Sequence, residues 1–352
     1  MGDMVLMKGN EAIAEAAIRS GCKHFFGYPI TPQTELSAYM AKKLPKIGGT
    51  FLQAESEVAA INMLYGAASA GVRAMTSSSS PGISLKSEGI SYIAAADLPC
   101  VIVDIMRGGP GLGGIQAAQS DYFQATRGGG HGDYHLIVLA PNSIQEMVCL
   151  TADGFNISEE YRIPVMLLSD GTLGQMMEPV DLDEIPKPMP AEKPWATTGT
   201  RGKRGPNVTK TLYLKPDELE ATVIEREKTY DIVKENLQRY DAHDIEDADI
   251  IISSYGITSR IVETAVKELR DEGIKVGVIR PITLWPFPEK IYKQVSPKAF
   301  LSVEMSMGQM VEDIKLACEC KVPVYFCGRT GGVIPEPQEI IAKVKSIMKE
   351  VM

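Results

Sequence analysis

The sequence predicts an α/β protein in which a larger domain, built on a parallel β-sheet with helices on both faces, precedes a smaller α/β domain. Short apolar segments alternate with helical patterns up to about residue 180. These apolar segments carry few polar positions, as strands buried on both faces require. The same alternation resumes near residue 249, after an interruption rich in proline.

The first domain begins with a helix from Asn10 to Arg19, for which Asn10 is the expected cap, and with a short strand at His24–Gly27. Thr31 and Pro32 are typical of an N-cap followed by proline at the first helical position, so a second helix is expected to begin there. The remaining strands and helices are expected at Thr50–Gln53, Glu57–Ala70, Val72–Ser77, Ile83–Ala95, Cys100–Met106, Leu136–Ala140, Ser143–Asn156 and Pro164–Ser169.

Several prolines and the basic run Arg201–Arg204 interrupt this pattern and indicate a linker or exposed arm, followed by a helix from Pro216 to Tyr240. The later elements are expected at Asp249–Ser254, Ser259–Asp271, Lys275–Ile279, Ala299–Glu304, a helix to about Cys318, Val322–Phe326 and a helix from Pro337. We therefore predict three segments, a first domain, a linker with a helix, and a second domain, over residues 1–183, 184–244 and 245–352.

The composition is that of an ordinary soluble protein, with 44% hydrophobic and 23% charged residues among 352. A net charge of −9 without a basic stripe argues against nucleic-acid binding, and charges or prolines interrupt the apolar stretches, which argues against a membrane span. The six dispersed cysteines are typical of reduced thiols, so a cytoplasmic location is expected. Cys318, Cys320 and Cys327 lack the spacing of a metal site, and we interpret them as buried thiols.

The segment Tyr28-Pro29-Ile30-Thr31-Pro32 lies between a strand end and a helix start. In an open parallel sheet, this is the edge at which ligands bind. One interpretation is structural: Thr31 caps its helix and Tyr28 packs. The other is functional, because a helix N-terminus with a free threonine hydroxyl suits a carboxylate. The two interpretations are compatible.

Glu57 opens a helix that is rich in small residues. A carboxylate in a first turn is favoured by the helix dipole, which is the structural explanation. The functional one is that a glutamate in a dry pocket can share a proton with the pyrimidine nitrogen of thiamine and so activate that cofactor. Glu55 is a rival for this role, since only one of the two can reach a single ring nitrogen.

Arg107 follows a buried strand and begins a glycine-rich run. Gly109, Gly111 and Gly114 match the GxGxxG pattern of dinucleotide sites, but Pro110 lies inside the loop and no acidic residue ends a second strand at the usual distance, so this signal is weak. Arg107 is either a surface residue or a fork that binds a substrate carboxylate with two hydrogen bonds.

Two further motifs are most simply structural. Ser77–Ser80 form a strand-to-helix turn whose hydroxyls could also bind a ligand. His131-Gly132-Asp133 follow a run of glycines, and a histidine there is more often structural than catalytic. The Gly-Asp-Gly motif through which thiamine enzymes bind the cofactor's diphosphate and Mg²⁺ does not occur in the sequence.

Together these motifs resemble the alpha subunit, which carries the pyrimidine-type domain, of 2-oxoacid:ferredoxin oxidoreductases. Tyr28–Pro32 matches the family's YPITP motif, Glu57 its thiamine-activating glutamate, and Arg107–Pro110 its arginine loop, while His131–Asp133 resembles its HG[ED] signature. The agreement runs in order over nearly the whole chain. The resemblance implies a pyrimidine-type thiamine diphosphate domain followed by a transketolase-C-like domain.

The resemblance also implies an enzyme that oxidatively decarboxylates a 2-oxoacid to acyl-CoA and CO₂, with coenzyme A as cosubstrate and ferredoxin as electron acceptor. Glu57 would be catalytic, and Thr31 and Arg107 would bind the 2-oxoacid carboxylate. The cofactor's pyrimidine would contact Glu57 together with Tyr28, Pro29 and Ile30. No metal site is expected on this chain.

The division of labour within such an enzyme implies partners. A beta subunit would carry the diphosphate end of thiamine diphosphate and its Mg²⁺. A ferredoxin-like subunit, or beta itself, would carry [4Fe-4S] clusters, and a gamma subunit could complete the complex.

The substrate expectation comes from the loop after Arg107. Members that use 2-oxoglutarate continue Arg-Gly-Gly-Pro into Ser-Thr-Gly-Leu-Pro-Thr, whereas residues 111–116 here are Gly-Leu-Gly-Gly-Ile-Gln. The Ser-Thr pair after the proline, with its two hydroxyls near the substrate, is lost and apolar surface is added. This favours a branched 2-oxoacid such as 3-methyl-2-oxobutanoate; 2-oxoglutarate and pyruvate stay as alternatives. Two other functions remain open: a nucleotide enzyme using Gly109–Gly114, and a non-catalytic scaffold with a thiamine-enzyme fold.

Overall fold

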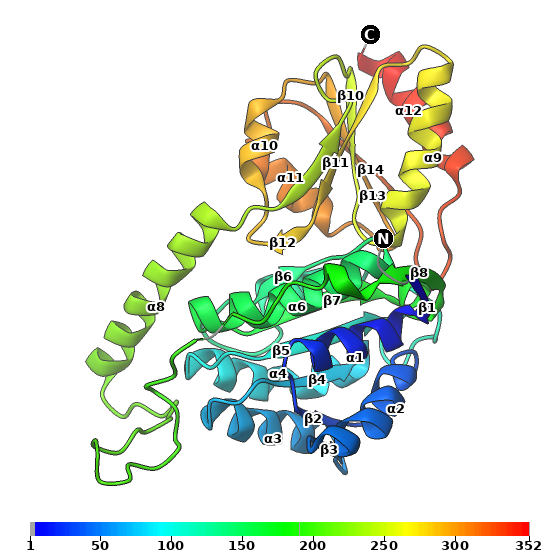
Figure 1. Cartoon of the computed structure of the whole chain (residues 1–352). Helices are drawn as coiled ribbons and strands as arrows, with labels where there is room; N and C mark the ends of the chain where they lie inside the picture. Colours follow the sequence, from blue (N-terminus) through cyan, green and yellow to red (C-terminus); the bar gives the residue numbers. More distant parts are fainter. Residues whose placement is uncertain (1–3, 190, 352) are drawn as a thin grey trace.

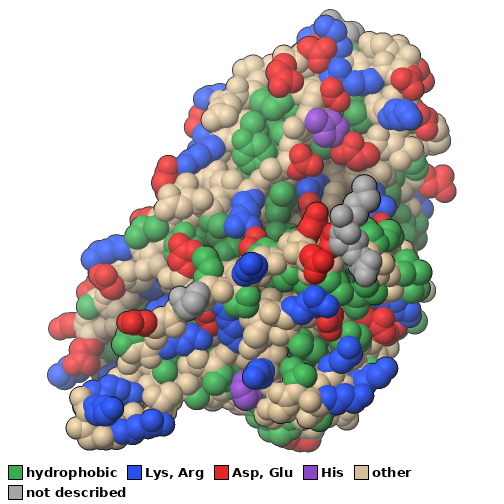
Figure 2. Space-filling view, in the orientation of Figure 1, with side chains coloured by type: hydrophobic (Ala, Val, Ile, Leu, Met, Phe, Trp, Pro, Cys, Tyr) green, Lys and Arg blue, Asp and Glu red, His purple; other side chains and the backbone are tan. Residues whose placement is uncertain are grey.

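The computed structural model describes residues 4–189 and 191–351 and shows two α/β units, the second stacked on the first (Figure 1). Helix α8 (Pro216–Asn236) runs diagonally along one side of the molecule, and the segment before it projects as an arm. Figure 2 shows Lys and Arg side chains gathered at the tip of this arm. Within the described residues, none of the helices is both long and apolar enough to cross a membrane.

The larger sheet has seven strands in the order β12-β6-β7-β5-β4-β2-β3, and all neighbouring pairs are parallel except β12 with β6. A parallel sheet covered on both faces, as the sequence predicts, is thereby confirmed. The strands are β2 (His24–Gly27), β3 (Thr50–Gln53), β4 (Ala74–Ser78), β5 (Val101–Met106), β6 (Ile137–Leu139), β7 (Val165–Asp170) and β12 (Thr283–Trp285).

The two faces of this sheet pack into separate apolar clusters. On β5, Val103 belongs to one cluster and Ile102 to the other, because successive side chains of a strand point to opposite faces. The first cluster includes α1, α2 and α6, and the second includes α3 and α4. These helices span Gly9–Arg19, Thr34–Lys43, Ile144–Tyr161, Glu57–Ser69 and Ser80–Ala95.

The second sheet has five strands in the order β14-β13-β10-β11-β9, parallel except for β9. Helices α9 (Ile257–Asp271) and α12 (Pro337–Val351) pack against one face of it. The other elements of this unit are β9 (Tyr240–His243), β10 (Ile250–Ser253), β11 (Val276–Pro281), β13 (Ala299–Glu304), β14 (Val324–Gly328), α10 (Glu289–Gln294) and α11 (Met310–Ala317).

Several short elements were not expected from the sequence. Strands β1 (Met4–Lys8) and β8 (Met177–Asp181) form an antiparallel pair, and β9 lies within the segment expected to be a linker. Strand β12 lies in the expected second domain, yet it pairs with β6 of the first sheet. The remaining short helices are α5 (Tyr122–Arg127), α7 (Gly171–Gln175) and the 3-10 turns Leu44–Ile47 and Leu182–Glu184.

Two expected helix caps are wrong. Helix α2 begins at Thr34, not at Pro32, because the carbonyls of the preceding segment bind side chains elsewhere in the fold: Thr31 O accepts from Arg107, and Pro32 O accepts from Asn10 Nδ2 at 2.7 Å. Asn10 therefore does not cap α1. Lys8 stands at that position, and Asn10 lies inside the helix, where its buried amide connects to the segment before α2.

The carboxyl ends of the parallel strands meet at one edge of the larger sheet, where the end of β7 and the loop after β5 contact the second unit. The segments that follow β2, β3, β4 and β5 at this edge contain four sequence motifs, beginning at Tyr28, Glu57, Ser77 and Arg107. The fold therefore brings the motifs to the place where open α/β sheets bind ligands.

The contact between α3 and α4 gives a prediction about stability. A Cβ atom on Gly89 would lie 2.8 Å from Cγ1 of Ile61 on α3, so Gly89→Ala should destabilise the protein by about 1–3 kcal/mol. Gly66→Ala on α3 is the control, because its Cβ would have no neighbour within 4 Å and should be neutral or stabilise by up to about 1 kcal/mol. Urea unfolding of the two variants measures both values, and equal effects would contradict this packing.

Candidate functional site

Glu57 is the first residue of α3, and only 6% of it is exposed. Its neighbour Ser56 caps the helix by accepting a hydrogen bond from the Ala59 amide at 3.2 Å. The carboxylate lies against α4 where Gly82 has no side chain, and Oε1 is 2.8 Å from the point a Cβ of Gly82 would occupy. Glu55, in contrast, is exposed before the helix. The fold thus gives only Glu57 a dry environment.

The polar residues at the end of β4 lie at the same sheet edge, where Ser78 Oγ and Glu57 Oε1 both approach Gly82. Ser77 Oγ donates to Gln33 Oε1 at 2.6 Å. The buried hydroxyls of Ser78 and Ser79 have no hydrogen-bond partner among the described residues. Buried hydroxyls without partners are costly, so their presence beside Glu57 indicates a surface that a ligand completes.

Arg107 is almost fully buried and lies next to Thr31. Nη1 donates to the Thr31 carbonyl at 2.9 Å and Nη2 to the Leu112 carbonyl at 3.0 Å. The buried Nε has no partner among the residues that the structure describes. The structure therefore brings together the two residues expected to bind a carboxylate, and the guanidinium has donors left for one.

The glycine-rich loop closes on itself instead of opening a helix. Arg107 forms a β-bridge with Ala117, and the Gly108 amide donates to the Gln116 carbonyl at 2.8 Å. The next helix, α5, begins only at Tyr122. A dinucleotide site needs the loop to lead directly into a helix N-terminus, so this geometry argues against the nucleotide interpretation.

The second unit fixes the far end of this loop through Gln119, which is fully buried. Its amide Nε2 donates to the Tyr255 carbonyl at 2.7 Å, and Oε1 accepts from the Met305 amide at 2.9 Å. Nearby, Asp170 at the end of β7 accepts a hydrogen bond from the Ile257 amide at 2.9 Å. Both contacts join the carboxyl edges of the two sheets.

A pair of carboxyl groups, the fully buried Asp104 and the partly buried Asp121, escaped the sequence analysis. Burial and the neighbouring Asp121 raise the pKa of Asp104 well above its usual value. Ser80 connects the pair to Arg107, since its hydroxyl donates to Asp121 and accepts from the Arg107 amide at 3.0 Å. An aspartate in the middle of an apolar strand was the available signal.

The other sequence motifs lie elsewhere or stay structural. His131–Asp133 form an exposed loop, and with α8 they line a hollow away from the start of α3. Cys318 is buried, but Cys320 is exposed and Cys327 half-buried, so the expectation of three buried thiols is wrong for those two. Among the described residues, no group of three or more Cys, His, Asp or Glu side chains is placed to bind a metal.

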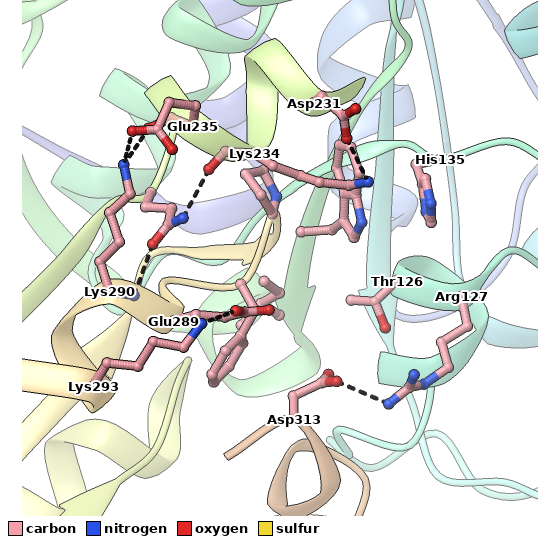
Figure 3. Close-up of a pocket in the computed structure, with 15 residues that line it drawn as sticks. Thr126, Arg127, His135, Asp231, Lys234, Glu235, Glu289, Lys290, Lys293 and Asp313 are labelled. Atoms are coloured by element: carbon pink, nitrogen blue, oxygen red, sulfur yellow. Dashed lines mark hydrogen bonds and ion pairs between the residues drawn. The ribbon is translucent and has the colours of Figure 1, made fainter. Parts of the chain in front are cut away.

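A separate hollow of about 530 Å³ lies between α5, α8 and α10 (Figure 3). Its cations are already neutralised. Lys290 pairs with Glu235 at 2.5 Å, and Arg127 pairs with Asp313 at 2.8 Å. It contains none of the residues that gather at the sheet edge, and its paired charges give it little attraction for an anion.

Comparison with known proteins agrees with this geometry. The family model for the thiamine diphosphate-binding region of pyruvate flavodoxin/ferredoxin oxidoreductase matches residues 15–246, and the model for core domain II of pyruvate:ferredoxin oxidoreductase matches residues 248–340. The chain is 48% identical to the ketoisovalerate oxidoreductase subunit VorB of Methanothermobacter marburgensis over 98% of both chains.

The chain belongs to the 2-oxoacid:ferredoxin oxidoreductase family. It is therefore a subunit of a thiamine diphosphate-dependent oxidoreductase that acts on a 2-oxoacid, as the motifs imply. The 2-oxoglutarate synthase subunit KorA of Methanocaldococcus jannaschii is also similar, with 38% identity over 95% of this chain and 97% of KorA. These relatives are named as subunits, so the family member described here is one part of a larger enzyme.

The fold agrees with solved structures. The 2-oxoglutarate:ferredoxin oxidoreductase of Magnetococcus marinus superimposes with a TM-score of 0.87 and 30% identity, and the match covers all of this chain and 66% of that one. A split-gene transketolase shares the fold, with a TM-score of 0.61 and 14% identity. The expected thiamine-enzyme fold with a transketolase-C-like second domain is confirmed.

The residues at the sheet edge fit the pyrimidine half of thiamine diphosphate. The cofactor's ring nitrogen needs a carboxylate in a dry setting, and Glu57 provides one beside the space left by Gly82. The unpaired hydroxyls of Ser78 and Ser79 offer further polar contacts. When bound, the cofactor supplies a nucleophilic carbon for attack on the 2-oxoacid.

The space beside Glu57 gives a prediction about cofactor binding. In Gly82→Ala the new methyl group would lie 2.8 Å from Glu57 Oε1 and overlap Ser78 Oγ, so the carboxylate must move. We expect thiamine diphosphate to bind the assembled enzyme at least about tenfold more weakly, because misplaced polar groups lose their hydrogen bonds. Calorimetry measures this, with Gly66→Ala as the control. Unchanged affinity would show that the pyrimidine does not lie there.

Proposed function

We propose that this chain supplies the pyrimidine-binding and carboxylate-binding half of an active site that is completed by a partner subunit. The observation that carries the proposal is the placement of a buried Glu57 and a buried Arg107 at one sheet edge, on a chain whose sequence has no Gly-Asp-Gly motif. The diphosphate and its Mg²⁺ would then be bound by a beta subunit.

In this proposal Glu57 shares a proton with the pyrimidine nitrogen. A carboxylate that is shielded from water interacts strongly with that proton, and this favours the form of the cofactor that can react. Tyr28, Pro29 and Ile30 form the wall after β2, where the Tyr28 carbonyl is fixed by a hydrogen bond from Gln33 Nε2 at 3.3 Å.

Arg107 and Thr31 would bind the carboxylate of the 2-oxoacid. Two carbonyls already orient the guanidinium, so little side-chain entropy is lost when substrate binds. That carboxylate leaves as CO₂, and a fixed, partly desolvated cation controls its orientation. The acyl group would pass to coenzyme A and the electrons, through [4Fe-4S] clusters on partner subunits, to ferredoxin.

We infer that the substrate is a branched aliphatic 2-oxoacid, with 3-methyl-2-oxobutanoate as the first candidate. The exposed side chains of the closed loop, Leu112 and Ile115, are apolar, being 82% and 60% exposed. They would face an aliphatic group without offering a donor to a second carboxylate. The name of the relative VorB, a ketoisovalerate oxidoreductase subunit, supports the same choice.

The substrate proposal predicts an order of turnover. The complex, purified anaerobically with its partner subunits, should reduce a viologen dye in a coenzyme A-dependent reaction. Turnover should be fastest with 3-methyl-2-oxobutanoate and at least about tenfold slower with 2-oxoglutarate or pyruvate. The second carboxylate of 2-oxoglutarate would be buried without a partner, and the methyl group of pyruvate would leave part of the pocket unfilled. Equal or faster turnover of 2-oxoglutarate would reject the branched-chain assignment.

The role of Glu57 predicts a large loss of activity on substitution. Glu57→Gln should lower kcat by about 10³-fold or more, because the amide cannot exchange a proton with the pyrimidine nitrogen. Glu55→Gln is the matched control, since Glu55 is an exposed carboxylate two positions away, and it should change kcat less than about twofold. Steady-state rates of the two complexes decide between an enzyme subunit and a non-catalytic scaffold, in which both variants would keep full activity.

A further inference from the structure

Lys86 is a fully buried lysine on α4. It lies on α4 four residues after Gly82 and three before Gly89, so the three positions share one face of the helix. Gly82 faces Glu57, and Gly89 faces Ile61 one turn further along α3. Lys86 therefore projects from the same face of α4 that receives the turn of α3 containing Glu57.

The ammonium group of Lys86 is fixed at the end of β4. Nζ donates to Thr76 Oγ1 at 2.8 Å and to the Ser77 carbonyl at 3.0 Å. Thr76 in turn donates to the Phe26 carbonyl of β2 at 2.6 Å. These neutral acceptors orient the ammonium without neutralising it, which leaves nearby carboxyl groups as its charge partners.

The titratable groups that face Lys86 come from two elements: Glu57 from α3, and Asp104 from β5, which has Asp121 as its neighbour. Burial lowers the pKa of Lys86 from its usual value to about 7, although both carboxyl groups raise it. A lysine at the surface would stay charged at all physiological pH values. This one changes its charge near neutrality, next to the carboxylate on which the proposed mechanism depends.

We propose that Lys86 is a positioning residue whose charge acts on the proton shared by Glu57 and the pyrimidine nitrogen. The inference rests on the proposed role of Glu57. A protonated Lys86 stabilises the ionised carboxylate of Glu57. The proton shared by Glu57 and the pyrimidine nitrogen is then lost more easily. When the pH rises and Lys86 becomes neutral, the pair holds that proton more tightly, and the enzyme stays active to higher pH.

The test uses two variants of Lys86 in the assembled complex. Lys86→Arg keeps the positive charge at every pH, so the alkaline limb of its kcat/KM profile should lie about one pH unit lower than in the wild type. Lys86→Met is never charged, and its alkaline limb should lie at or above that of the wild type. If all three profiles share the same alkaline limb, whatever the absolute rates, the proposal is overturned.

A second measurement does not depend on activity. Between pH 7 and 10 the unfolded chain binds a proton at Lys86 that the folded chain does not, so the stability of the wild type should rise with pH relative to Lys86→Met. The unfolding equilibrium constant of the wild type, relative to that of Lys86→Met, should fall by up to about tenfold per pH unit in this window. A parallel pH dependence of the two full-length chains in urea unfolding would also overturn the proposal.

The two results separate this inference from the proposed function. If the complex oxidises no 2-oxoacid but the unfolding data show the titration of Lys86, the proposed function fails and the altered charge of Lys86 stands without its catalytic role. If turnover depends on Glu57 while both Lys86 variants have the same alkaline limb of the kcat/KM profile as the wild type, only the inference about Lys86 fails.

Discussion

The side-chain hydrogen bonds of Gln119 connect the loop that begins at Arg107 to the second unit. The loop from Arg107 to Ala117 is exposed at its tip, and its return strand is held by the β-bridge between those two residues. Two positions later, the buried side-chain amide of Gln119 makes its hydrogen bonds with residues of the second unit, namely Tyr255, Thr258 and Met305. The loop that begins at Arg107 thus connects the two units, and its geometry depends on how they dock.

The sheet edge that contains Glu57 and Arg107 is a polar region within an apolar sheet. Ser78 and Asp104 lie opposite each other on neighbouring parallel strands, and both point to the face covered by α4. Buried polar atoms without partners reduce stability, and three gather here that have no hydrogen-bond partner among the described residues: Ser78 Oγ, Ser79 Oγ and Arg107 Nε. The stability lost in this region is compensated by the apolar clusters on either face of the sheet, which is typical of a site arranged for function.

The sequence was sufficient for the architecture and for the main site residues. Strands β2, β3 and β13 begin and end at the predicted residues. Of the three, only β13 is buried throughout, as a strand with both faces covered requires, whereas β3 is an exposed edge strand. Glu57 and Arg107 were found because each follows a predicted strand. The choice between Glu57 and Glu55 needed the structure, since only packing against Gly82 shows which carboxylate is buried.

What the sequence could not show depends on contacts between distant segments. The carbonyls of Thr31 and Pro32 bind Arg107 and Asn10, and no local propensity reveals this. Lys86 has the spacing of an ordinary surface lysine on a helix, and its burial follows from the close approach of α3 to α4, which Gly82 and Gly89 permit. Whether the domain limits expected at residues 183 and 245 describe independent units stays a prediction.

Strand β12 has a practical consequence for recombinant expression. It comes from the C-terminal part of the chain and covers the outer side of β6, whose three residues are fully buried. A truncated protein that stops near residue 246, where the first family model ends, would leave the backbone amides and carbonyls of β6 open to water. Exposed strand edges of this kind pair with other chains. Such a fragment should therefore aggregate, and the two segments are better produced as one polypeptide.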